Sequence, residues 1–150
     1  MKKIGLSILA VALLLEVTTS FAKDETTEEL NKRVVTEFYQ KAINDKDFNA
    51  AEAYLGPWYI QHNPLAQDGI EGFKQFIEYL KTTYPQSHSE IKRVFSSGDY
   101  VILHVHSMKE PDTRGQANVD IFRLQNNKIV EHWDAIQSIP AEAANGNGMF

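Results

Sequence analysis

The residues of this chain that are best suited to move a proton lie in two stretches of its second half. His104 and His106 are two positions apart in an apolar stretch, so on a β-strand both side chains point to the same face. Asp120 shares a strand face with Phe122 in the next apolar stretch. A carboxylate among apolar neighbours has a raised pKa and can act as a general acid or base. We predict that Asp120, beside His104 or His106, transfers protons inside a pocket.

Two other interpretations of these residues stay open. Asp120 can instead bridge within the sheet while both histidines face solvent on its outer surface. His104, His106 and Asp120 can also be read as two imidazoles and a carboxylate around a metal ion, although this spacing arises easily by chance on a strand. The sequence has no Gly-rich phosphate loop, which argues against a nucleotide cofactor.

Further candidate residues surround the expected pocket. His62 precedes an Asn-Pro turn, where it can bind a substrate oxygen at the rim or tie the turn to the sheet. Trp133 can form an aromatic wall of the pocket or belong to the core, and Asp134, on the opposite face of its strand, is a second carboxylate candidate. The residues that we expect to contact the ligand are Trp58, Asn63, Phe73, Asn118, Phe122, Trp133 and Asp134.

Helical periodicity fills the first half of the chain. Thr26 and Glu29 form a capping box, which predicts the start of a helix. Apolar residues then recur at helical spacing in three separate segments. The expected helices run from Thr26 to the break at 44–46, from Asp47 to Gly56-Pro57, and from Asp68 to Pro85, with a short extended segment at 58–62.

The second half alternates in the manner of β-strands. Asn126 and Asn127 form a tight hairpin turn, because asparagine tolerates the left-handed conformation. Three helices followed by a four-strand meander indicate an α+β domain. A strongly curved sheet packed against helices leaves a cone, and the open end of the cone is a natural pocket. The expected strands are 89–97, 100–108, 116–125 and 129–137.

Composition and the N-terminal residues indicate an exported protein. Two lysines precede an apolar run at 4–15, and Ser20-Phe21-Ala22 resembles a cleavage site, so residues 1–22 are expected to be a signal peptide. One domain, residues 23–150, is then secreted or periplasmic and touches a membrane only through its signal. The 150-residue chain has a net charge of −5 and no cysteine, which argues against nucleic-acid binding and excludes thiol chemistry.

Several segments resemble the SnoaL-like polyketide cyclases of the nuclear-transport-factor-2-like (NTF2-like) superfamily. They are residues 59–64, 68–73, 119–123 and 128–134. The last six residues, 145–150, resemble the tail of a bacterial subgroup described as SnoaL-like aldol-condensation enzymes. This resemblance implies a cone-shaped fold in which three helices pack on a strongly curved, mainly antiparallel sheet that encloses a pocket.

The resemblance also implies a chemistry. SnoaL-like cyclases use an Asp on a sheet strand as acid and base, with a His on the preceding strand, and close a ring through an enolate without metal or cofactor. Asp120 and His106 match that arrangement by segment and order, with His104 as the alternative partner. We therefore expect no metal and no cofactor.

Two functions follow as hypotheses. The first is a cofactor-free cyclase or isomerase acting on a small hydrophobic carbonyl compound, with His62 and the strand histidine stabilising an oxyanion. The second is a non-catalytic envelope protein that binds a small hydrophobic ligand in the same pocket. We also expect a homodimer formed through the outer face of the sheet, because the second and third strands have an additional apolar face. The residues assigned to that outer face are Val101, Leu103, Val105, Val119 and Ile121.

Overall fold

The computed structural model describes residues 25–150, and the expected signal peptide at 1–22 lies outside them. Within the described part of the chain, no helix is long and apolar enough to cross a membrane. The elements in chain order are α1 (Thr27–Tyr39), the π-helical turn η1 (Gln40–Asn44), α2 (Phe48–Glu52), β1 (Leu55–Gln61), α3 (Gly69–Thr83), β2 (His88–Ser97), β3 (Tyr100–Met108), β4 (Gln116–Gln125) and β5 (Lys128–Ser138).

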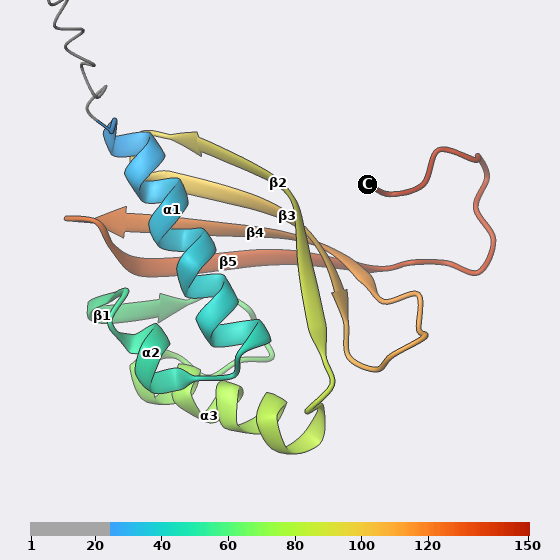
Figure 1. The fold of residues 1–150 in the computed structure, drawn as a ribbon, viewed down its shortest axis with the longest axis horizontal. Helices are drawn as coiled ribbons and strands as arrows, with labels where there is room; N and C mark the ends of the chain where they lie inside the picture. Colours follow the sequence, from blue (N-terminus) through green and yellow to red (C-terminus); the bar gives the residue numbers. More distant parts are fainter. Residues whose placement is uncertain (1–24) are drawn as a thin grey trace, which may run out of the picture.

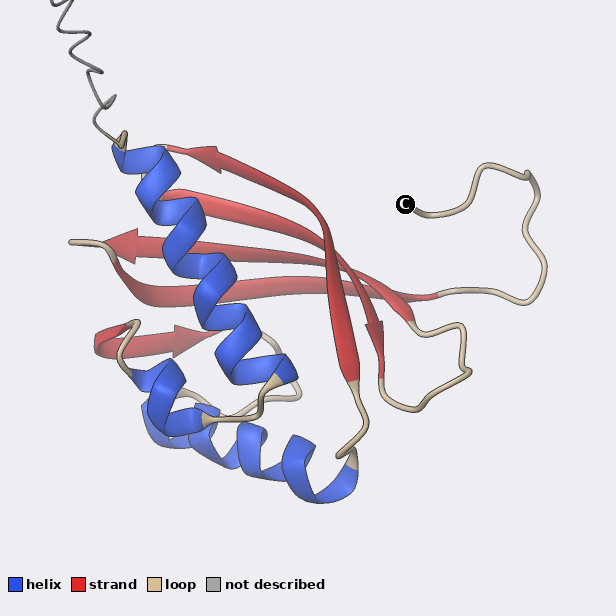
Figure 2. Ribbon diagram, viewed as in Figure 1, coloured by secondary structure: helices blue, strands red, loops and turns tan. Residues whose placement is uncertain are grey.

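The five strands form one curved sheet in the order β1-β5-β4-β3-β2. Strands β2 to β5 pair antiparallel with their neighbours, whereas β1 pairs parallel to β5. The helices lie on one side of this sheet, with α1 crossing over it and α3 running near β1 (Figures 1 and 2). The α+β class and the curved, mainly antiparallel sheet are therefore confirmed, and the extended segment expected at 58–62 is part of a fifth strand.

The first helix begins as its sequence predicts. Thr26 is the N-cap, its hydroxyl accepts a hydrogen bond from the Glu29 amide, and the Glu29 carboxylate accepts one from the Thr26 amide. The opposite end of the helical segment is less regular, because η1 is a π-helical turn, which is wider than an α-helix, and Lys46 then adopts a positive φ of 53°. This kink turns the chain so that α1 can cover the sheet while α2 packs below it.

The second helix is shorter than expected. Asp47 caps α2 as predicted, but Leu55 already belongs to β1, and so do the glycine and proline that were expected to end the helix. A Cβ atom on Gly56 would lie 2.6 Å from Cγ1 of Val130 on β5. Glycine therefore allows β1 to lie against β5 at this point.

Asp68 occupies the N-cap position of α3 but does not cap it with its side chain. Its Oδ1 instead accepts a hydrogen bond of 2.8 Å from the Gln61 amide at the end of β1. The carboxylate thereby ties the two ends of the connecting loop together.

The core lies between the helices and the concave face of the sheet. Val101, Leu103 and Val105 of β3 are fully buried there and pack with Phe38 of α1 and Phe73 of α3. Residues directly opposite one another on paired strands share a face, so the pairing of Leu103 with the neighbouring strand decides which residues of β4 point inward.

Candidate functional site

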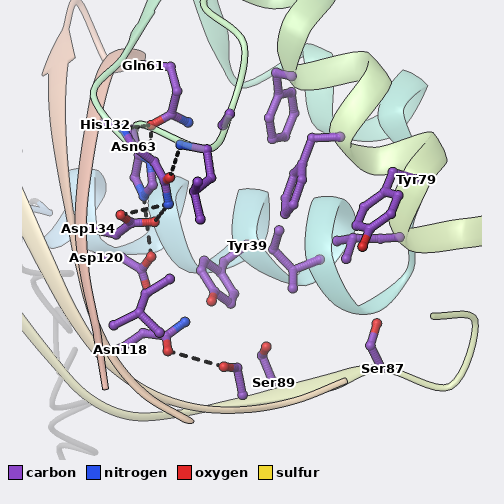
Figure 3. A pocket seen from close by; sticks show the side chains of 18 of the residues that line it. Tyr39, Gln61, Asn63, Tyr79, Ser87, Ser89, Asn118, Asp120, His132 and Asp134 are labelled. Atoms are coloured by element: carbon purple, nitrogen blue, oxygen red, sulfur yellow. Dashed lines mark hydrogen bonds and ion pairs between the residues drawn. The ribbon is translucent and has the colours of Figure 1, made fainter. Parts of the chain in front are cut away.

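A cavity of about 560 Å³ opens between the concave face of the sheet and the helices. Its volume lies in the range of small-molecule sites. One end is lined by aromatic and aliphatic side chains of α1 and α3, and the other end by polar side chains of the sheet and of the loop after β1 (Figure 3). The residues at the polar end are Gln61, Asn63, Asn118, Asp120, His132 and Asp134.

Asp120 points into this cavity and is 5% exposed. Its backbone pairs with Leu103 of β3, which places its side chain on the concave face. Burial raises the pKa of its carboxyl group above the ordinary value, although His132 opposes the shift with a hydrogen bond and its charge. Oδ2 of Asp120 is buried and has no hydrogen-bond partner among the described residues.

His132 on β5 is the partner of Asp120. Its Nε2 lies 3.3 Å from Oδ1 of Asp120, and its Nδ1 lies 3.0 Å from Oε1 of Gln61. Because an amide oxygen only accepts hydrogen bonds, Nδ1 carries a proton. The hydrogen bond at Nε2 then needs one further proton, held either by the Asp120 carboxyl or by the imidazole. The pair therefore holds a shared, transferable proton.

A β-bulge in β5 places His132 on the concave face. Arg123 of β4 pairs with Glu131, and the next residue, Leu124, pairs with Ile129, so Val130 is an additional residue on β5. Both Ile129 and Val130 are buried as a result. Beyond the bulge, the side chains of β5 are shifted by one position relative to a regular hairpin.

Asp134 completes the polar end of the cavity. It lies opposite Asp120 in the β4–β5 pairing, and both of its oxygens accept hydrogen bonds from Nδ2 of Asn63, at 2.9 and 2.7 Å. Oδ1 of Asn63 accepts a hydrogen bond from the Leu65 amide in the same loop. Asn63 therefore holds the loop after β1 against the site.

Two buried tyrosines supply hydroxyl groups near the carboxylates. The hydroxyl of Tyr39 on α1 faces Asp120 and Ser89, and burial raises the pKa of Tyr39 well above its ordinary value (Figure 3). Burial also raises the pKa of Tyr59. Both phenols thus stay protonated across the physiological range and can donate hydrogen bonds.

The predicted partnership of Asp120 with His104 or His106 is wrong. His104 pairs with Val119 and His106 with Ala117, so both histidines lie on the outer face of the sheet, away from Asp120. The buried face of β3 carries valine and leucine instead. The metal reading that joined these histidines to Asp120 is excluded by the same geometry.

Three other expected site residues do not line the cavity. His62 donates a hydrogen bond of 2.8 Å from Nε2 to the Glu131 carboxylate and stacks on Trp133, with ring centroids 4.6 Å apart and an interplanar angle of 4°. This stack lies on the outer face. Gln61 precedes His62 and His132 precedes Trp133, and because both of these preceding side chains point into the cavity, His62 and Trp133 point outward. Trp58 is 46% exposed and also lies outside the cavity lining.

The remaining expected contacts do line the cavity. They are Asn63, Phe73, Asn118, Phe122 and Asp134. Sequence reasoning missed His132 and Gln61 as members of the site, although it placed His132 and Asp134 on one face of their strand.

One group in the described part of the chain could surround a metal ion. Asp120, His132 and Asp134 each offer a ligand atom, and these atoms lie within 4.8 Å of one another. Two carboxylates and one imidazole are a donor set that suits several divalent ions. In this structure, Asn63 donates to both oxygens of Asp134, and His132 is engaged with Oδ1 of Asp120, whereas Oδ2 of Asp120 has no partner among the described residues.

Comparison with known proteins gives a family and a fold. The family model described as SnoaL-like polyketide cyclase matches residues 33–145. No curated protein matches the sequence. Among solved structures, TsrD from Streptomyces laurentii is 20% identical, with a TM-score of 0.60 over 71% of this chain and 87% of that one.

Two further structures have the same fold. An NTF2-like protein of unknown function from Cytophaga hutchinsonii is 21% identical, with a TM-score of 0.59 over 77% of this chain and 94% of that one. A SnoaL-like protein of unknown function from Burkholderia thailandensis is 16% identical, with a TM-score of 0.63 over 74% and 97% of the two chains. At these identities the likeness concerns the fold, so the chemistry has to be argued from the site.

Proposed function

The chain belongs to the SnoaL-like polyketide cyclase family, and from this premise we propose that it catalyses cofactor-free proton transfer on a small hydrophobic carbonyl compound, as an aldol-type cyclase or isomerase. The observation that carries the proposal is the buried Asp120–His132 pair at the polar end of an otherwise largely apolar cavity. A carboxylate with a raised pKa and an unpartnered oxygen is suited to accept a proton from carbon.

The proposed reaction begins when Oδ2 of Asp120 removes a proton from the carbon next to a substrate carbonyl. The electron pair of that C–H bond moves to the carbonyl oxygen, which gives an enolate. The Tyr39 hydroxyl, which lies beside Asp120, is placed to donate a hydrogen bond to this oxygen. In this step the shared proton is on Nε2 of His132, so Asp120 begins as a carboxylate and ends as the carboxylic acid, with its new proton on Oδ2.

The second half of the reaction returns the proton. In an aldol closure, the enolate carbon attacks a second carbonyl of the same molecule and forms a C–C bond, and Asp120 gives its proton to the new alkoxide. In an isomerase, the proton returns to a different carbon. Neither path consumes an external reactant, and the aromatic side chains of the apolar end would hold the rest of the substrate.

Proton exchange on a simple ketone tests this proposal. Loss of the α-proton signals of cyclohexanone in D₂O, followed by NMR, should be accelerated by the protein and should increase with pH through the raised pKa of Asp120. Asp120→Asn should slow the exchange by about 100-fold or more, the usual contribution of a general base. Asp99→Asn, in the exposed turn between β2 and β3, is the matched control.

A second candidate function is ligand binding without catalysis, which the aromatic lining of the cavity supports equally. The two functions can be distinguished with a ketone that displaces a neutral dye from the cavity. If the α-protons of this ketone exchange at the buffer rate over the whole pH range, the result favours a binding protein and overturns the proposal of an enzyme.

We also propose export and dimerisation. Export rests on residues 1–22, and mass spectrometry of the secreted protein should find Lys23 as its first residue.

Of the residues expected on the outer face, Val101, Leu103 and Val105 are instead in the core. Val119 is 40% exposed and Ile121 shares its face, so an apolar outer surface still supports the dimer.

A further inference from the structure

The C-terminal segment, residues 139–150, leaves the sheet and curves back toward it (Figure 1). Residues 141–148 are exposed, whereas Met149 and Phe150 are half-buried. Residues that are covered again after eight exposed residues are held there by particular contacts, because such a segment is otherwise mobile.

Phe150 lies on the outer face of the sheet against both histidines of β3. Its ring centroid is 5.2 Å from that of His104 and 4.8 Å from that of His106, with interplanar angles of 34° and 36°. Nζ of Lys92 lies 5.6 Å from the same ring centroid. We call His104, His106 and Lys92 the Phe150 seat. It is made of one cation and two aromatic rings, which are groups that favour an aromatic ligand.

The two imidazoles of the seat are held in fixed orientations. Nδ1 of His104 lies 3.0 Å from a guanidinium nitrogen of Arg93, and a guanidinium only donates, so this Nδ1 is an acceptor. Nε2 of His106 lies 2.8 Å from the carbonyl oxygen of Arg114, which only accepts, so this Nε2 is a donor. The seat is therefore preorganised by bonds that do not involve Phe150.

The C-terminal segment contacts the β3–β4 turn, residues 109–115, both directly and through His106. His106 holds the Arg114 carbonyl, Arg114 donates to the carbonyl oxygen of Pro140 at 2.9 Å, and the Ile139 amide donates to Gly115 at 3.1 Å. At the other end of the segment, the ring of Phe150 packs against the ring of His106. The turn is thus attached to both ends of the C-terminal segment.

The same turn forms part of the wall of the cavity. Lys109 at its start lines the cavity, and so do Met108 and Gln116, which flank the turn in β3 and β4. Gly115 lies so close to β3 that an added Cβ would be 2.2 Å from the carbonyl oxygen of Ser107. A displacement of the turn is therefore transmitted to the cavity wall.

We propose that residues 139–150 are a strap, and that the binding of Phe150 in its seat fixes the β3–β4 turn and, through it, the cavity wall. The strap acts within its own chain. It affects ligand binding whether or not the protein is an enzyme, so its test does not depend on catalysis.

Hydrogen exchange and dye binding on the full chain test the strap. Phe150→Ala should increase the exchange rates of the amides in residues 109–115 and weaken binding of the neutral dye Nile red, each by about three- to tenfold, as expected for the loss of one aromatic pair. Phe150→Tyr should restore both values. Glu142→Ala, in the exposed part of the strap, is the matched control and should change neither.

A second variant separates the seat from general loss of stability. His104→Ala should change exchange and dye binding in the same direction as Phe150→Ala, and the double variant should add little, because His104 contacts the Phe150 ring and makes no hydrogen bond to the turn. Unchanged exchange in residues 109–115 of Phe150→Ala would overturn the proposal. An equimolar mixture of the two single variants tests whether Phe150 of one copy binds the seat of another. Recovered protection of residues 109–115 in the mixture would show that it does, and this would overturn a strap that acts within one chain.

Discussion

At the scale of single residues, the buried carboxyl group of Asp120 suits proton transfer but lowers the stability of the folded protein when it is ionised. Burial raises its pKa, so the folded protein binds the proton of this carboxyl group more tightly than the unfolded chain does. Folding is consequently most favoured below the ordinary pKa of aspartate, and stability falls as the pH rises through the raised folded pKa. The residue that we assign as the base is therefore expected to weaken the fold at neutral pH.

Asp120→Asn should therefore stabilise the protein while it removes activity. The amide cannot ionise, so thermal unfolding followed by circular dichroism at pH 7 should show a midpoint raised by roughly 3 °C, a shift that corresponds to less than 1 kcal/mol for a domain of this size. The gain should shrink at a pH below 4, where the wild-type carboxyl is protonated too. A lower midpoint than that of the wild type at pH 7 would show that the contact with His132 outweighs the cost of burial.

Tyr39 should act on the rate without being needed for the fold. Tyr39 lies beside Asp120 and lowers the pKa of its carboxyl group, so Tyr39→Phe should move the acidic limb of the proton-exchange profile to higher pH. It should also slow exchange about 10- to 100-fold through the lost donor to the enolate. Tyr59→Phe is the control, because its hydroxyl contacts the Gln61 side chain instead. Equal effects of both variants would contradict a specific role for Tyr39.

At the scale of elements, the inner face of β4 could be predicted from the sequence, whereas the inner face of β3 depends on the register of strand pairing. Alternation with Phe122 and Leu124 was sufficient to place Asp120 on the inner face. It was not sufficient for β3, because Tyr100 and Ile102 make the histidine face apolar as well. Only the pairing of β3 with β4 resolves which face is buried, and pairing depends on contacts between strands rather than on either strand alone.

The bulge in β5 explains why His132 was missed. A regular two-residue hairpin at Asn126–Asn127 would pair Asp120 with Trp133, and His132 would then point outward. The observed partner of Asp120 is Asp134. The only trace of the bulge in the sequence is two successive apolar residues at 129–130, a pattern that is also common in regular strands.

The β3–β4 turn requires glycine at position 115. Its φ is 72°, and an added Cβ would meet the backbone of Ser107, so Gly115→Ala should lower the free energy of unfolding by about 2–4 kcal/mol. Gly98→Ala is the control, since Gly98 also has a positive φ of 56° but no atom within 4 Å of an added Cβ. It should cost only about 1 kcal/mol. Equal losses in chemical denaturation would contradict the close packing of the turn.

At the scale of the whole molecule, the outer face of the sheet is the surface where a second copy is expected. Val119→Glu places a charge at an exposed position of that face and leaves the core intact. Light scattering should then give the mass of one chain for this variant and of two chains for the wild type at micromolar concentration, with unchanged circular dichroism. Glu110→Gln, on an exposed loop, should remain dimeric. A monomeric wild type would remove the proposal.

The site is assembled from parts of the chain that are far apart in sequence, and this bears on the order in which the molecule folds. The hydrogen bonds of Asn63 with Asp134 and of Gln61 with His132 each join residues 71 positions apart. Strands β2 to β5 pair with sequence neighbours and close much shorter loops, which costs less entropy and is faster. After dilution from denaturant, the far-ultraviolet signal of the meander should therefore recover before the cavity binds dye, since docking of β1 on β5 is the step that completes the site.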